Sequence, residues 1–173
     1  MSNKLLAAID RLDALISAAC RVVLYVTTVA LFAILTINVF LRYLAGTSLQ
    51  SAGEAPELMF PWMVMAGVVL AAQHGAHISI AWFVEHLPEG ARRPVAIANC
   101  ALLVIAYGTL VHAAVKLLPI VADERSHVLG VPASVTYSCL LAGFIGLILT
   151  AIGNAIRLWH GARLPHEVTI AAG

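Results

Sequence analysis

Four apolar runs, each long enough to cross a lipid bilayer as an α-helix, dominate this sequence. They cover about residues 17–43, 57–74, 94–118 and 132–159, and the second is the shortest. A helix needs roughly 20 apolar residues to span a hydrocarbon core of about 30 Å. With 61% hydrophobic and 11% charged residues, a chain of 173 residues cannot hide this much apolar surface from water. The sequence therefore predicts an all-α membrane protein with four transmembrane helices in a single membrane domain.

The segment 78–87, between the second and third runs, has the pattern of a short amphipathic helix. Its apolar residues at positions 80, 83, 84 and 87 share one helix face, and Glu85 and His86 interrupt them. The segment is too short to span the bilayer and too apolar for a free loop. We expect an interfacial helix that lies in the membrane plane, with Trp82 at the depth of the lipid headgroups.

Lysine and arginine residues predict the orientation, because cytoplasmic flanks of membrane spans are enriched in them. Four spans put seven of these residues on the side of both termini and three on the other side. The seven are Lys4, Arg11, Arg21, Arg92, Arg93, Arg157 and Arg163, and the three are Arg42, Lys116 and Arg125. We therefore expect both termini to be cytoplasmic.

Polar residues inside the spans limit what the chain can do alone. No span carries an Asp or Glu in its middle, where a proton relay or ion-coupled pump would need one. His112 and Lys116 lie four residues apart in the third span. They are either a functional polar pair or residues near the outer end, where Lys can extend to water, and the second interpretation is favoured.

Two further patterns concern contacts between helices. In the fourth run small residues recur every four positions, at Ser138, Ala142, Gly146 and Thr150, and Gly143 lies beside this line. Such a stripe lets two helix backbones approach closely, either within this chain or against another subunit. Near the outer ends of the first two spans, Arg42 either anchors its helix at the interface or forms an ion pair with Glu54 or Glu57. The ion pair is favoured, and we expect Arg42 and Glu54 to meet.

Cofactor chemistry is weakly supported. The three cysteines, Cys20, Cys100 and Cys139, form no C-x-x-C pair and are interpreted as packing residues. His74 and His160 end two spans at the same side, so a bis-histidine haem is geometrically open, although histidines at helix ends are usually interfacial. The net charge of +1 gives no basic field for nucleic acid. We expect no cofactor, no metal, no nucleic-acid partner and no enzymatic activity.

Four short motifs, in order along about residues 15–159, are similar to one family. They are Asn38-Val-Phe-Leu-Arg42-Tyr43; Glu54 followed by Trp62 and Gly67; Gly75-Ala-His77-Ile78; and Leu129-Gly130-Val131-Pro132 followed by Tyr137 and Gly143. Together they resemble the DctQ-like small membrane subunit of tripartite ATP-independent periplasmic (TRAP) transporters. The chain departs from the family pattern at positions 51–53, 57 and 81.

The resemblance implies an accessory subunit of a sodium-coupled, binding-protein-dependent uptake system for an organic acid in a bacterial inner membrane. Its partners would be a large elevator-type permease that it braces as a scaffold, a periplasmic substrate-binding protein and membrane lipids. The alternatives are a self-sufficient small channel or exporter and a redox subunit that binds haem or quinone. The candidate structural and interface residues are Asn38, Arg42, Tyr43, Glu54, Trp62, Gly67, His77, Gly130, Pro132, Tyr137, Gly143 and Gly146.

Overall fold

The computed structural model describes residues 2–73 and 89–159. They form four α-helices: α1 (Ser2–Leu44), α2 (Ser51–Gln73), α4 (Glu89–Val121) and α5 (Ala133–Trp159). All four are long and apolar enough to cross a membrane, which confirms the predicted all-α class with four spans. The interfacial helix predicted at 78–87, and His77, lie outside the described residues.

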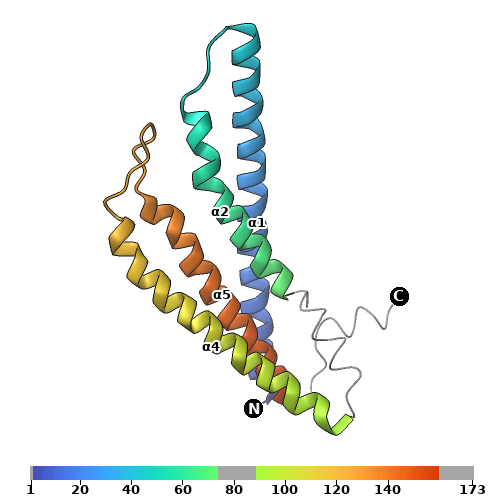
Figure 1. Cartoon of the computed structure of the whole chain (residues 1–173). Helices are drawn as coiled ribbons and strands as arrows, with labels where there is room; N and C mark the ends of the chain where they lie inside the picture. Colours follow the sequence, from blue (N-terminus) through green and yellow to red (C-terminus); the bar gives the residue numbers. More distant parts are fainter. Residues whose placement is uncertain (1, 74–88, 160–173) are drawn as a thin grey trace.

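The helices form two antiparallel hairpins, α1–α2 and α4–α5, that meet along α2 and α5 (Figure 1). In the described structure α4 packs against α5 alone, and α1 packs mainly against α2. The four helices therefore make an open row in the order α1, α2, α5, α4 and do not close into a bundle. We call the end with the 45–50 and 122–132 connections the hairpin end. The opposite end, where α1 begins and α5 ends, is the terminal end.

Helix α1 is much longer than a membrane span requires. The helix begins well before the first apolar run and continues into it without a break, from Ser2 to Leu44. Its 43 residues rise about 64 Å at 1.5 Å per residue, roughly twice the hydrocarbon thickness. The first part of α1 is therefore available to contact the terminal ends of other helices.

Glycines bring α2 and α5 together. A side-chain carbon added at Gly143 would overlap the terminal methyl group of Met65 and lie 3.3 Å from the Met65 Cβ, and one added at Gly146 would lie 3.4 Å from Val69 Cγ1. Both glycines are buried. The small residues of the fourth span thus pack within this chain at these two positions, while Ala142 of the predicted stripe is exposed.

Candidate functional site

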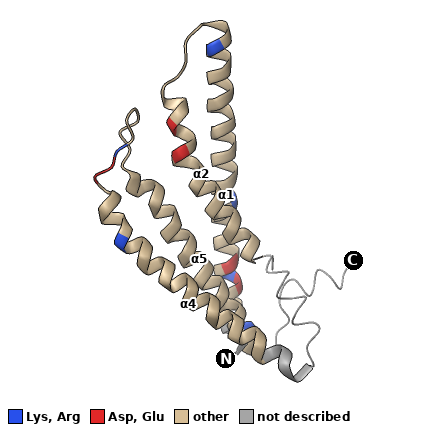
Figure 2. Cartoon of the chain, in the orientation of Figure 1, with Lys and Arg blue, Asp and Glu red and all other residues tan. Residues whose placement is uncertain are grey.

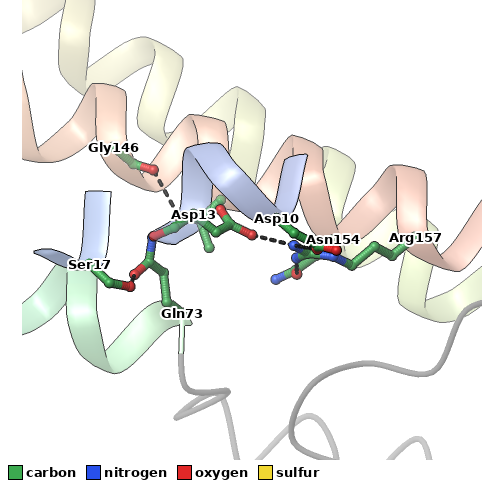
Figure 3. A network of polar contacts seen from close by, with 8 residues as sticks. Asp10, Asp13, Ser17, Gln73, Gly146, Asn154 and Arg157 are labelled. Carbon is green, nitrogen blue, oxygen red and sulfur yellow. Dashed lines mark hydrogen bonds and ion pairs between the residues drawn. The ribbon is translucent and has the colours of Figure 1, made fainter. Parts of the chain in front are cut away.

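A cluster of polar side chains lies at the terminal end, around Arg157 near the end of α5 (Figure 3). The Arg157 Nη2 atom lies 2.8 Å from Asp10 Oδ1 and 2.5 Å from Asp13 Oδ2. Its Nη1 atom donates a hydrogen bond of 3.1 Å to Asn154 Oδ1. Arg157 is 8% exposed, so this guanidinium is buried between α5 and the first part of α1. We call these four residues the Arg157 cluster.

Local sequence spacing builds the Arg157 cluster. Asp10 and Asp13 are three residues apart on α1, and so are Asn154 and Arg157 on α5, which places each pair on one helix face. Gly153 allows close approach, because a side-chain carbon there would lie 3.1 Å from Ile9 Cγ2. Among the sequence-based expectations, Arg157 contributes to the predicted orientation alone, and neither aspartate is a candidate residue. The signal that could have revealed the Arg157 cluster is the presence of two polar pairs, each with i, i+3 spacing, on two different helices.

Gln73 ties the last residue of α2 to the same part of α1. Ser17 Oγ donates a hydrogen bond to Gln73 Oε1, and Gln73 Nε2 donates one of 3.3 Å to the backbone oxygen of Asp13. Figure 3 shows these contacts beside the Arg157 cluster. Three helices, α1, α2 and α5, are therefore joined by polar contacts at the terminal end.

A second polar clamp lies at the hairpin end, around Glu54 on α2. The Glu54 carboxylate accepts hydrogen bonds from the hydroxyl of Ser126 and from the backbone N–H groups of Val128 and Leu129, at 3.0 and 3.1 Å. These donors belong to the 122–132 loop, which connects α4 to α5. Glu54 thus fastens the α1–α2 hairpin to the α4–α5 hairpin, and we call this contact set the Glu54 clamp.

Backbone hydrogen bonds define the conformation of the 122–132 loop. Ser126 N donates to Val131 O at 3.0 Å, and Ala133 N donates to Glu124 O at 2.8 Å. Gly130 has a φ of +63°, a left-handed conformation that favours glycine. Two sequence motifs, the one that begins at Glu54 and the Leu-Gly-Val-Pro motif, are therefore brought together by one set of hydrogen bonds.

The predicted ion pair between Arg42 and Glu54 is wrong. Both ion pairs among the described residues belong to Arg157. The register of α1 against α2, set by Thr28 with Met63 and by Ser17 with Gln73, places Glu54 level with roughly residue 37, more than one helix turn from Arg42. Asn38, one turn before Arg42, instead accepts a hydrogen bond of 2.9 Å from the backbone N–H of Leu49.

Other candidate residues are spread over the structure and form no common site. Gly67 packs against α1, where an added side-chain carbon would lie 3.9 Å from Leu24 Cδ1. Tyr43 is 81% exposed, and Trp62 and Tyr137 are half-buried. Pro132 directly precedes α5.

Most charged residues of the described structure are positioned towards the ends of the helices (Figure 2). At the hairpin end an open cleft of about 500 Å³ lies between α2 and the 122–132 loop. Its lining residues are Glu54, Glu57, Leu58, Glu124, Arg125, Ser126 and His127. Within residues 2–73 and 89–159, no three His, Cys, Asp or Glu side chains gather as metal ligands would. The geometry is that of a framework fastened at both ends.

The Glu54 clamp gives a local prediction. In Glu54→Gln one carboxylate oxygen becomes an NH₂ group, which cannot accept the hydrogen bonds from the loop. We expect hydrogen exchange of the Val128 and Leu129 amides to accelerate about tenfold, because the loop opens more often. Glu57→Gln is the matched control, since the exposed Glu57 carboxylate makes no hydrogen bond with a described residue. Equal exchange rates in both variants, measured by mass spectrometry in detergent, would contradict the clamp.

Comparison with known protein families gives one match. The sequence model of the DctQ component of tripartite ATP-independent periplasmic transporters matches residues 31–161. This stretch covers most of the chain, including Asn38, the Glu54 clamp and Arg157. It leaves out the first part of α1, where both aspartates of the Arg157 cluster lie.

Individual relatives agree with this match. An uncharacterized protein of Sinorhizobium fredii is 34% identical over 139 residues, which cover 80% of this chain and 26% of that protein. The chain therefore spans about a quarter of the length of this relative. The ectoine TRAP transporter small permease protein of Halomonas elongata is 29% identical over 84% of this chain and 75% of its own length. The sialic acid TRAP transporter small permease protein of Vibrio cholerae is 27% identical over 47% of each chain.

Proposed function

This chain belongs to the DctQ component family of tripartite ATP-independent periplasmic transporters, and from this premise we propose that it braces a large permease as a static scaffold. It is a multi-pass protein of the inner membrane and a small permease subunit. The proposed system takes up an organic acid, driven by sodium, and receives its substrate from a periplasmic binding protein. The name of the sialic acid relative supports the substrate class.

The observation that carries the scaffold proposal is the fastening of the two hairpins at both ends. The Glu54 clamp joins the two hairpins at the hairpin end, the Arg157 cluster joins them at the terminal end, and Gly143 and Gly146 allow close contact between these ends. Contacts at both ends and along the α2–α5 interface should keep the two hairpins from sliding past each other or moving apart. A support must keep its shape while its neighbour moves, and this architecture meets that need.

The spans of this chain favour a scaffold role over a role in carrying substrate. Transport sites in membrane proteins are usually built from interrupted helices and polar groups at the midplane. Here α1, α2, α4 and α5 are each continuous in the described structure, and no span carries an acidic residue in its middle. The proposed orientation places both termini in the cytoplasm, on the evidence of the Lys and Arg distribution.

Reconstitution tests the proposed function. Liposomes would contain this chain alone, the large permease of the same transporter alone, or both, with the binding protein and labelled substrate outside. We expect sodium-dependent uptake only when both membrane proteins are present, because the scaffold carries no transport site of its own. Uptake by this chain alone would contradict the proposal, and so would full uptake by the large permease without it. As the control for ion coupling, the sodium gradient is replaced by a potassium gradient.

A further inference from the structure

Helix α4 has one face that no helix of the described structure covers, because α4 packs against α5 alone. Exposed residues recur along this face at every helix turn and lie within about 80° of arc around the axis. They are Leu102, Ile105, Thr109, His112, Lys116 and Ile120. We call this set the α4 stripe. The buried residues of α4, Cys100, Ala114 and Val121, lie on the opposite side of the helix.

The α4 stripe carries polar groups within the predicted membrane span. The first charged residue after α4 is Asp123, eleven residues beyond His112 and seven beyond Lys116. At 1.5 Å per residue, His112 is about 16 Å along the helix axis from Asp123, and Lys116 is about 10 Å from it. Arg93 flanks the other end of the span, 30 residues before Asp123, so His112 lies a little over a third of the way into the span from the hairpin end.

Lipid alone is a poor environment for this stripe. A lysine can extend its stem to the interface, but the short histidine side chain of His112 cannot reach water from that depth. Neither His112 nor Lys116 forms a hydrogen bond or ion pair with another residue of the described structure. Polar groups in a membrane are normally turned towards protein, where they find hydrogen-bonding partners.

Resting on the proposed function, we propose that the α4 stripe is the surface on which the large permease docks, and that the permease presents a carboxylate to His112 and Lys116. Leu102, Ile105 and Ile120 supply the apolar contact around this pair. A second copy of this chain is a poor occupant, because its own stripe would bring Lys116 against Lys116. The spans of this chain also offer no acidic residue at their middle to pair with His112.

Co-purification in mild detergent tests the proposal. The chain would be tagged and expressed with the large permease as wild type, as Lys116→Glu, and as the double variant His112→Leu with Lys116→Met. We expect at least a tenfold loss of recovered permease in both variants, because the permease carboxylate is repelled or left unpaired. Arg21→Met is the matched control, since it removes an exposed cation from α1 and should change nothing. If lipid covers the stripe, the double variant recovers as much permease as wild type or more, which overturns the proposal.

A photo-crosslinker at Ile105 gives an independent measurement that leaves His112 and Lys116 intact. We expect an adduct with the large permease. An adduct with a second copy of this chain, or with lipid alone, overturns the proposal even if the substituted chains accumulate poorly.

The two proposals fail in different ways. Wild-type chain that recovers no permease contradicts the proposed function, whereas recovery that is insensitive to the stripe contradicts this inference only.

Discussion

Arg157→Met is expected to lower the free energy of unfolding by about 3 kcal/mol, the lower end of the range for removing one partner of a buried ion pair. The lower end applies because the side chain of Asp10 is 67% exposed and stays hydrated, whereas that of Asp13 is 20% exposed and loses its only charged partner in the described structure. The effect is local to the terminal end, where α1 should separate from α5. Titration from mild detergent into sodium dodecyl sulfate, followed by circular dichroism, measures it.

Two further variants separate the ion pair from the loss of a charge. Arg11→Met removes an exposed arginine next to Asp10 on α1 and should leave the stability unchanged. Adding Asp10→Asn and Asp13→Asn to Arg157→Met should recover most of the loss, because no buried charge then lacks a partner. If the single variant is as stable as the wild type, the Arg157 cluster does not hold the two helices together.

Gly143→Leu should separate α2 from α5 and lower the free energy of unfolding by about 2–3 kcal/mol, the upper part of the range for overpacking a close contact. The flexible end of Met65 can move aside for one methyl group, so Gly143→Ala should cost far less. The Cβ of either residue lies 3.3 Å from the Met65 Cβ, which cannot move without the α2 backbone. The atoms of leucine beyond its Cβ need further space in the same contact, and this space is lacking. The same detergent titration measures the change.

Gly108→Leu is the matched control for this prediction. A side-chain carbon added at Gly108 of α4 meets no atom within 4 Å, so the substitution should be neutral or slightly stabilising through its better helix propensity. Combining Gly143→Leu with Met65→Ala should recover part of the loss, because the new side chain then occupies the space of the old one. Equal losses in Gly143→Leu and Gly108→Leu would show that glycine at 143 has no packing role.

These predictions bear directly on the scaffold proposal. If the two hairpins act as one rigid support, variants that loosen their joint should reduce uptake in the reconstituted system even though they touch no transport site. The α4 stripe is on the opposite side of α4 from α5. Variants of the stripe should therefore weaken assembly with the permease without lowering the stability of the chain itself.

Much of the architecture was predictable from the sequence because the bilayer imposes a strong constraint. A membrane span must be apolar over its whole length and must satisfy its backbone hydrogen bonds internally, so the four helices could be read from hydropathy. The close approach at Gly143 was also foreseeable as a small-residue contact. The sequence left open whether that contact lies within the chain, and the packing of Met65 against Gly143 shows that it does.

The pairing of polar residues was not predictable, because it depends on helix register and rotation. Arg42 and Glu54 are close to the same predicted boundary, yet the register of α1 against α2 separates them by more than one helix turn, and Glu54 accepts hydrogen bonds from the 122–132 loop. Arg157 and its aspartates are more than 140 positions apart in the sequence. Their contact exists only because α1 extends past its membrane span and meets the end of α5.

The four apolar runs by themselves determined the class of protein and the number of crossings, because the hydrophobic effect and the bilayer thickness act on each segment separately. Tertiary structure alone decided which residues fasten these helices to one another. It selected Glu54 and Arg157 as the fastening points at opposite ends and left the α4 stripe uncovered by the other described helices. The reason is physical: burial of a span depends on its own composition, but a hydrogen bond or an ion pair requires two specific groups at one place.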